Sequence, residues 1–237
     1  DLPTSSGLNT ASIESVTETA KLGIKNDFQV CVHAIGDRAN REVLDIYEKM
    51  FRDFPSQFPR RWRIEHAQHL HPDDIPRFGK LGVIASMQGI HCTSDAIFVP
   101  QRLGMRRSEQ GAYVWKSLIE SGAIVTNGTD APVEDVDPIA SFYASVTRRL
   151  TDKVTFFPEQ VLTREQAIRS YTIDNAYAAF EENIKGSLVP GKLADIVVLN
   201  NDLIQCDAEE IKNTRVEMTI IDGRIAFQAK TPTKNPK

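Results

Sequence analysis

Three polar side chains of the kind that bind metals or move protons each follow a short apolar stretch of sequence. They are His33, His66 and Asp130. Parallel strands deliver the residues at their carboxyl ends to one edge of a sheet, so we expect these side chains to lie close together. Neutral imidazole and carboxylate oxygen are ligands of catalytic zinc. The sequence therefore predicts a metal-hydrolase site, in which Asp130 also moves protons between the attacking water and the leaving group.

Each of these residues also has a structural interpretation when it is considered alone. His33 shares a strand face with Cys31, and a histidine there can be a hydrogen-bonded core residue. Asp130 lies in Gly-Thr-Asp-Ala-Pro and can be a turn residue or a helix cap. The second histidine favours the metal interpretation, because His33 and His66 end successive strands and can reach one ion.

The remaining histidines give weaker signals. His91 follows the next expected strand on the same edge, where it could contact substrate, and it could equally be a residue of a mobile loop. His69 and His71 have the spacing of a metal-binding pair, but they lie beyond the strand that ends at His66 and directly before Pro72, where a helix is expected to begin. We therefore interpret His69 and His71 as loop residues.

The elements that must position these side chains alternate between strands and helices. A long polar loop is expected at residues 88–110, between the third strand and the fourth helix. Strands are expected at 28–33, 62–66, 83–87 and 123–127, and helices at 12–22, with Gly23 as the stop, 38–51, 73–80, 112–120 and 137–150. The strands are almost continuously apolar, which is typical of a parallel α/β sheet covered on both faces. A closed (β/α)8 barrel needs eight strand–helix units and ~200 residues or more, so the sequence predicts about half of a TIM barrel.

The pattern changes after residue 150. Thr163-Arg164-Glu165-Gln166 is a capping-box signature that opens a helix extending to about Phe180. Asp222-Gly223 separates two apolar runs and predicts a hairpin. We therefore expect a partial barrel domain over residues 1–180 and the strands of a small β domain over 181–237. The expected strands of this second part are 195–199, 216–221 and 224–227.

Composition excludes several classes of function. The chain has 237 residues, 41% of them apolar, and a formal net charge of −4 without a basic block, so nucleic acid is not an expected partner. No apolar stretch is long enough to cross a bilayer, and a membrane is not an expected partner either. The 3 cysteines lack Cys-x-x-Cys spacing, which favours a reducing, cytoplasmic location. Phosphate-binding glycine loops and serine-hydrolase elbows are absent from the sequence.

Several runs together give the chain a specific resemblance. It resembles the amidohydrolase superfamily, and most of all the C-terminal portion of amidohydrolase family 3, which includes N-substituted formamide deformylase-like proteins. This resemblance implies metal-dependent hydrolysis of non-peptide carbon–nitrogen bonds in a small amide or formamide-type substrate. The matching runs are Val32–Ala39, Arg63–Gln68, Gly128–Val133, Gly191–Leu199 and Thr219–Arg224.

The resemblance also implies roles for individual residues. His33 and His66 would be the ligands from the fifth and sixth barrel strands, and Asp130 the ligand and proton carrier from the eighth. The complete enzyme would hold one or two divalent ions, zinc in the first place. The family's first-strand His-x-His pair and its bridging fourth-strand residue are expected before Asp1. The expected partner is thus further N-terminal polypeptide or a second copy of the chain, and the alternative is a non-catalytic half-barrel that serves as a binding or assembly module.

Overall fold

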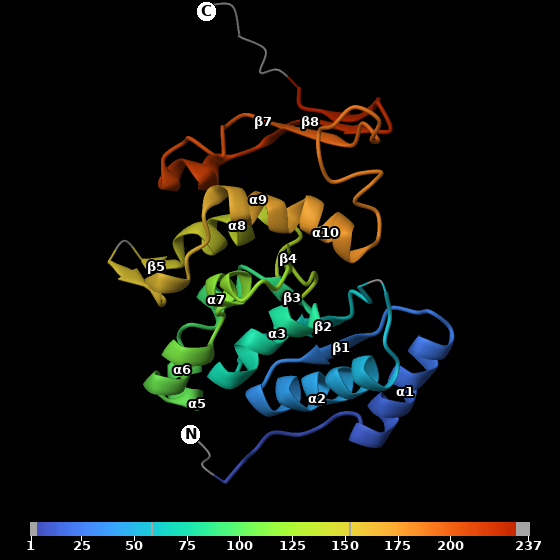
Figure 1. The fold of residues 1–237 in the computed structure, drawn as a ribbon. Coiled ribbons are helices and arrows are strands. Elements are labelled where there is room, and N and C mark those ends of the chain that lie inside the picture. Colours follow the sequence, from blue (N-terminus) through green and yellow to red (C-terminus); the bar gives the residue numbers. More distant parts are fainter. Residues whose placement is uncertain (1–3, 58, 152, 231–237) are drawn as a thin grey trace, which may run out of the picture.

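A four-stranded parallel sheet forms the centre of the computed structural model, which describes residues 4–57, 59–151 and 153–230. The strands follow one another in chain order across the sheet, and Figure 1 shows α1 and α2 beside one end of it and α8, α9 and α10 beside the other. The four expected strands and their parallel pairing are confirmed. They are β1 (Cys31–Ala34), β2 (Arg63–His66), β3 (Ile84–Gln88) and β4 (Val125–Gly128).

The longest helix covers the outer face of the sheet. Helix α2 (Asp37–Asp53) buries Val43, Leu44, Tyr47 and Met50, as its apolar stripe predicts. The Tyr47 ring packs edge-on against that of Trp62, with 4.9 Å between the ring centroids. This cluster fixes the start of β2 against the helix layer. Further helices before β4 include α1 (Ile13–Lys25), η1 (Pro72–Asp74), α3 (Ile75–Leu81) and α7 (Trp115–Glu120).

The prediction that helix α1 stops at Gly23 is wrong. The helix continues to Lys25, and Gly23 is buried within it. A Cβ atom at this position would lie 2.4 Å from a methyl group of Val30 and 3.7 Å from the Trp62 ring. Glycine is therefore required here by close packing between the helix and the chain leading into β1, rather than by helix termination.

The expected polar loop over residues 88–110 is wrong, because this segment forms three short helices. They are α4 (His91–Ser94), α5 (Val99–Leu103) and α6 (Met105–Gly111). Cys92 and Val99 are buried in the main core, so tertiary packing stabilises helices that are too short to be stable alone. The following helix also begins at Trp115 rather than at Ala112.

Two of the later helices end earlier than expected. Helix α8 (Pro138–Thr147) is followed by Arg148, the C-cap residue, whose φ of 52° lies in the left-handed region. The chain then forms a hairpin. The expected helix from Thr163 to Phe180 has the predicted capping box but breaks at Thr172, where φ is −124° and ψ is −95°. The resulting elements are β5 (Arg149–Thr151), β6 (Val154–Thr155), η2 (Pro158–Gln160), α9 (Arg164–Tyr171) and α10 (Ile173–Ala178).

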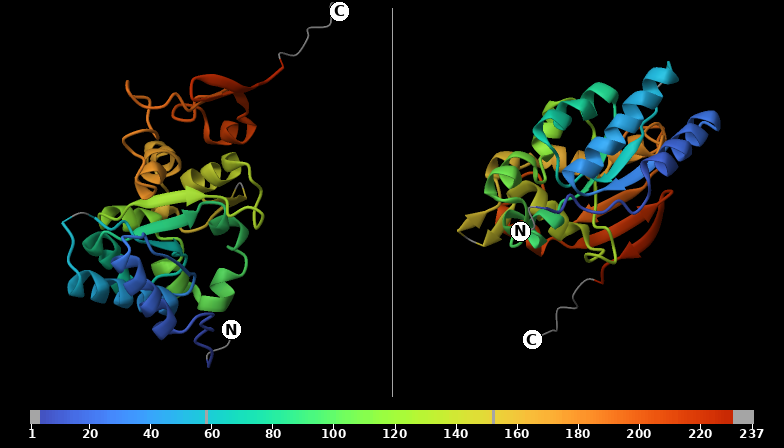
Figure 2. Two further views of the ribbon diagram at one scale, coloured as in Figure 1. Left: turned by 90° about the vertical axis from the view of Figure 1, so that its right-hand side faces the viewer. Right: turned by 90° about the horizontal axis from the view of Figure 1, so that it is seen from below.

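A three-stranded antiparallel sheet follows, and Figure 1 and the left view of Figure 2 place helices α8 to α10 between it and the parallel sheet. Asp222 and Gly223 both have positive φ, which confirms the predicted hairpin. Val197 and Phe227 remain 54% and 50% exposed, so this sheet has an apolar surface. Its elements are β7 (Ile196–Leu199), β8 (Val216–Ile221) and β9 (Arg224–Gln228), with η3 (Ala208–Asn213) between β7 and β8. Residues 231–237 of the second expected domain lie outside the described residues.

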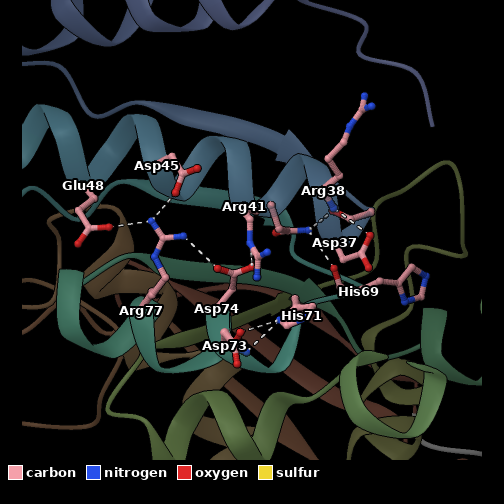
Figure 3. Close-up of polar contacts among 12 residues, drawn as sticks. Asp37, Arg38, Arg41, Asp45, Glu48, His69, His71, Asp73, Asp74 and Arg77 are labelled. Atoms are coloured by element: carbon pink, nitrogen blue, oxygen red, sulfur yellow. Dashed lines mark hydrogen bonds and ion pairs between the residues drawn. The ribbon is translucent and has the colours of Figure 1, made fainter. Parts of the chain in front are cut away.

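An ionic network joins α2 to the segment η1–α3 on the outside of the sheet (Figure 3). The Asp74 carboxylate is buried and accepts from Arg41 Nε at 2.8 Å and from Arg77 at 3.0 Å. Arg77 also donates to Asp45 at 2.7 Å and to Glu48 at 2.8 Å. The network holds α2 against η1 and α3 behind β1 and β2.

Across the described part of the chain, no helix has the length and apolar character needed to cross a bilayer.

Candidate active site

His33 projects from the sheet face that the helices leave open. Cys31 and His33 are exposed, whereas Ala34 on the opposite face is buried. The strand partner of His33 is Glu65 on β2. Because side chains alternate along a strand, His33 and Glu65 share this open face.

His66 reaches the same place by a departure from strand geometry. Simple alternation would put it on the face of Ile64, which is fully buried under the helices. Instead, His66 has a φ of 73° and Ala67 a φ of 43°, both in the left-handed region. The imidazole turns back to the open face, where its ring centroid lies 4.5 Å from that of His33 with the ring planes at 72°. The structure therefore brings the two predicted histidines together.

A glutamine at the end of β3 orients the His66 ring. Gln88 Oε1 lies 2.8 Å from His66 Nδ1. A carbonyl oxygen only accepts, so Nδ1 is the donor, and in the neutral form of the ring this leaves the lone pair on Nε2. This is the arrangement that second-shell partners impose on metal-binding histidines.

His33 is held in its neutral form. Burial lowers its pKa below the ordinary histidine value, and the neighbouring His66 lowers it further. The carboxylates of Asp130 and Glu65 act in the opposite direction. A neutral imidazole is the form that can bind a metal or accept a proton.

Asp130 lies beyond β4, exposed and in a left-handed conformation with a φ of 59°. Its carbonyl accepts the Val133 N–H at 2.8 Å, so the turn role considered for this residue is real. Its charge also raises the pKa of both His33 and His91, although burial dominates and lowers both values. Asp130 is therefore a turn residue, and its negative charge acts on the pKa of His33 and of His91.

His91 continues the row of histidines. It is the first residue of α4, is 6% exposed, and stacks on His66 with the ring centroids 6.0 Å apart and the planes at 17°. Neither of its ring nitrogens has a hydrogen-bond partner among the residues that the structure describes. Such buried and unpaired nitrogens are rare in proteins, and here they leave a donor and an acceptor free for a ligand.

The backbone before His91 is anchored to β4 and α8. The Gly89 N–H donates to Asn127 Oδ1 at 2.8 Å, and the Ile90 N–H donates to Ser141 Oγ at 3.1 Å. A Cβ atom on Gly89 would lie 2.1 Å from Ser145 Oγ. Gly89 thus supplies both a backbone hydrogen bond and the space for close packing.

The described residues supply only part of a metal site. In residues 4–57, 59–151 and 153–230, no group of three or more histidine, cysteine, aspartate or glutamate side chains is placed to hold a metal ion. Catalytic zinc needs three protein ligands, whereas the ring contact on β1 and β2 brings together two, His33 and His66. The donor chemistry fits a divalent metal, but the set of ligands within this chain is not assembled.

His69 and His71 do not join the site. The backbone of His69 forms an isolated bridge with Ala112, and burial lowers its pKa to about 4. His71 is the N-cap of η1 and accepts the Asp73 N–H at 3.2 Å through its ring. Their interpretation as loop residues is confirmed.

Sequence reasoning missed the residues that surround the histidines. The sequence analysis places Gln88 at the start of a polar loop, whereas the structure places it at the end of β3. Its position directly after an expected strand is the signal that could have marked it as a site residue. Gln68, Asp95 and Tyr113 form a buried cluster behind the site. Their separation along the chain leaves no local signal for this cluster.

Comparison with known proteins agrees with this geometry. Residues 2–227 match the family described as Amidohydrolase family. The chain belongs to the amidohydrolase family. The match covers both the parallel sheet with its histidines and the antiparallel sheet. The resemblance inferred from the strand-end motifs is thus confirmed, including its restriction to the C-terminal portion of longer proteins.

Individual relatives are considerably longer than this chain. Protein LONG AFTER FAR-RED 3 of Arabidopsis thaliana is 38% identical over 85% of the chain, which spans 35% of that protein. The N-substituted formamide deformylase of Arthrobacter pascens is 26% identical over 94% of the chain, which spans 41% of it. An uncharacterized metal-dependent hydrolase from Pyrococcus horikoshii has a similar structure, with a TM-score of 0.75 and 28% identity over 87% of the chain and 41% of its own. These relatives support metal-dependent hydrolysis in general.

Proposed function

We propose that this amidohydrolase chain supplies the C-terminal half of an active site that hydrolyses a carbon–nitrogen bond in an amide or formamide-type small molecule. The observation that carries the proposal is the pairing of His33 and His66 at 4.5 Å, with Nε2 of His66 left open. The formamide deformylase among the relatives supports this substrate class. Ligands from polypeptide outside this chain, or from a second copy, would complete the set.

Each residue of this chain has a defined task in the proposal. A divalent metal, zinc in the first place, would activate water and polarise the substrate carbonyl when bound. His33 and His66 would present neutral ring nitrogens to that metal. Asp130 would accept a proton from the attacking water on a carboxylate oxygen and return it to the leaving nitrogen. His91 would hold the substrate through its unpaired ring nitrogens.

The finer architecture belongs to the same proposal. Residues 1–180 would be half of a (β/α)8 barrel, and 181–237 would contribute strands to a composite β-sandwich. The exposed apolar side chains of Val197 and Phe227 are consistent with a surface that another β-sheet covers. The sparse cysteines support a cytoplasmic location.

Metal analysis together with a substrate panel tests the proposed function. The protein as produced from its gene is expected to hold stoichiometric divalent metal and to hydrolyse N-substituted formamides or N-acyl compounds. His33→Ala should lower metal content and reduce kcat/KM by at least about 100-fold, because it removes one ligand. His71→Ala is the matched control, since His71 contacts Asp73 within η1 rather than the paired histidines, and it should retain both properties.

A non-catalytic half-barrel is the second candidate, favoured by the lack of an assembled ligand set within the described residues. It predicts neither stoichiometric metal nor hydrolysis in the wild-type protein, and no difference between His33→Ala and His71→Ala. That combination of results would replace the hydrolase proposal by a binding or assembly function.

A further inference from the structure

A hydrogen-bonded cluster of three side chains lies behind the row of histidines. The Asp95 carboxylate accepts from the Tyr113 hydroxyl and, on the same oxygen, from Gln68 Nε2 at 3.0 Å. The Gln68 amide also donates to the Tyr113 oxygen at 2.5 Å. Gln68 is 5% exposed and Tyr113 is fully buried, whereas Asp95 is half-buried, so the two buried donors depend on the Asp95 carboxylate.

The cluster connects the two segments that carry His66 and His91. Gln68 lies two residues after His66, and Tyr113 donates its backbone N–H to the Gln68 carbonyl at 2.8 Å. Asp95 lies four residues after His91 and donates its N–H to the His91 carbonyl at 2.9 Å. The Asp95 carboxylate therefore ties helix α4 directly to the turn that follows β2.

That turn needs such an anchor. His66 and Ala67 both have positive φ, which non-glycine residues adopt only where the surroundings hold them. Gln88 fixes the ring of His66 but not the backbone beyond it. Gln68, two residues after His66, is held in two places: its side-chain amide donates to Asp95, and its backbone carbonyl accepts the Tyr113 N–H.

We propose that Asp95 is a positioning residue that sets the spacing and the parallel stacking of the His66 and His91 rings. The proposal rests on the proposed function insofar as these rings act in hydrolysis. Asp95 offers one carboxylate oxygen to two buried donors, so its removal leaves both donors unpaired and releases α4 from the turn. A shift of ~1 Å in a catalytic group can cost ~100-fold in rate.

Three substitutions test this role in the full protein. Asp95→Ala removes the acceptor and should lower kcat/KM by about 10- to 100-fold. Asp95→Asn keeps one acceptor oxygen and should lose less, so the ordering of the two variants shows rescue by the conservative change. Asp73→Ala, with an 82% exposed side chain in η1, is the control and should match the wild type.

A spectroscopic measurement separates positioning from general stability. The ¹⁵N and ¹H resonances of the His66 and His91 rings should shift in Asp95→Ala and stay unchanged in Asp73→Ala. If Asp95→Ala does not fold, Tyr113→Phe removes one hydrogen bond of the cluster while keeping the buried ring, and the same measurements apply. Unchanged ring resonances with kcat/KM within twofold of the wild type would overturn the proposal.

Failure of the proposed function gives a different result. In that case the wild-type protein hydrolyses none of the substrates, and the ring resonances alone decide the role of Asp95. Their shift in Asp95→Ala would still support the positioning role, whereas their invariance would overturn it. The hydrolase proposal and the positioning proposal therefore fail independently.

Discussion

Replacing Asp74 by alanine should destabilise the protein more than any single surface ion pair could. Its carboxylate side chain is only 2% exposed and serves two arginines, at 2.8 Å from Arg41 and 3.0 Å from Arg77. Truncating one partner of a buried ion pair costs about 3–5 kcal/mol. The Arg41 side chain is 43% exposed and can regain water, and Arg77 is 19% exposed and keeps two other carboxylates. We therefore expect a loss of about 2–3 kcal/mol, below the full range.

Urea unfolding of the two proteins measures this loss as a shift in midpoint with an unchanged slope. Asp45→Ala is the matched control, because Asp45 binds the same Arg77 but has a 62% exposed side chain, and it should cost less than about 1 kcal/mol. Asp74→Asn should fall between the two, since an amide oxygen can still accept from one arginine. Equal losses for Asp74→Ala and Asp45→Ala would refute the argument that burial makes the Asp74 carboxylate dominant in the network.

Two further predictions concern residues that connect the loops beside the site. The pKa of His69 is lowered to about 4 by burial, so the unfolded chain binds a proton near pH 6.5 before the folded one does. The contribution of neutral His69 to the free energy of unfolding is thus fully present above pH 6.5, and up to about 3 kcal/mol of it is lost as the pH drops towards 4. Urea unfolding across this pH range measures the loss, and the dependence on pH should be weaker in His69→Gln. Asn40 is fully buried and its amide donates to the carbonyls of Gly36 at 2.9 Å and Ala34 at 3.1 Å. Asn40→Ala should cost about 2 kcal/mol by calorimetry, and a loss below about 0.5 kcal/mol would contradict this.

The order of strands and helices could be predicted because its signals are local. The four strands of the parallel sheet lie within one to three residues of the segments predicted for them, and α2 shows its buried stripe in the spacing of Val43, Tyr47 and Met50. The hairpin at Asp222 follows from turn chemistry alone, since Asp-Gly favours the positive φ that both residues adopt. The position of His33 on the open face also follows from alternation along β1.

Features that depend on distant contacts could not be predicted in this way. Helices α4, α5 and α6 have 4, 5 and 7 residues, and their stability comes from burial rather than from their own propensity. The Asp95 cluster joins residues 27 and 45 positions apart in sequence. Sequence reasoning recognised His91 as a candidate but placed it on a polar loop, because nothing local reveals that α4 is anchored from behind.

His66 shows how a candidate site can contradict the rule that seemed to predict it. Its strand partner is Ala34, which is buried on the helix-covered face, so regular alternation would have kept His33 and His66 on opposite faces of the sheet. Only the left-handed backbone at His66 brings the rings to 4.5 Å. Glycine would adopt that backbone at lower cost but has no imidazole. His66 is held in a conformation that favours glycine, with Gln88 at its ring and Gln68 two residues on. The left-handed backbone at His66 is therefore the feature that joins the two histidines, and alternation along the strand could not have predicted it.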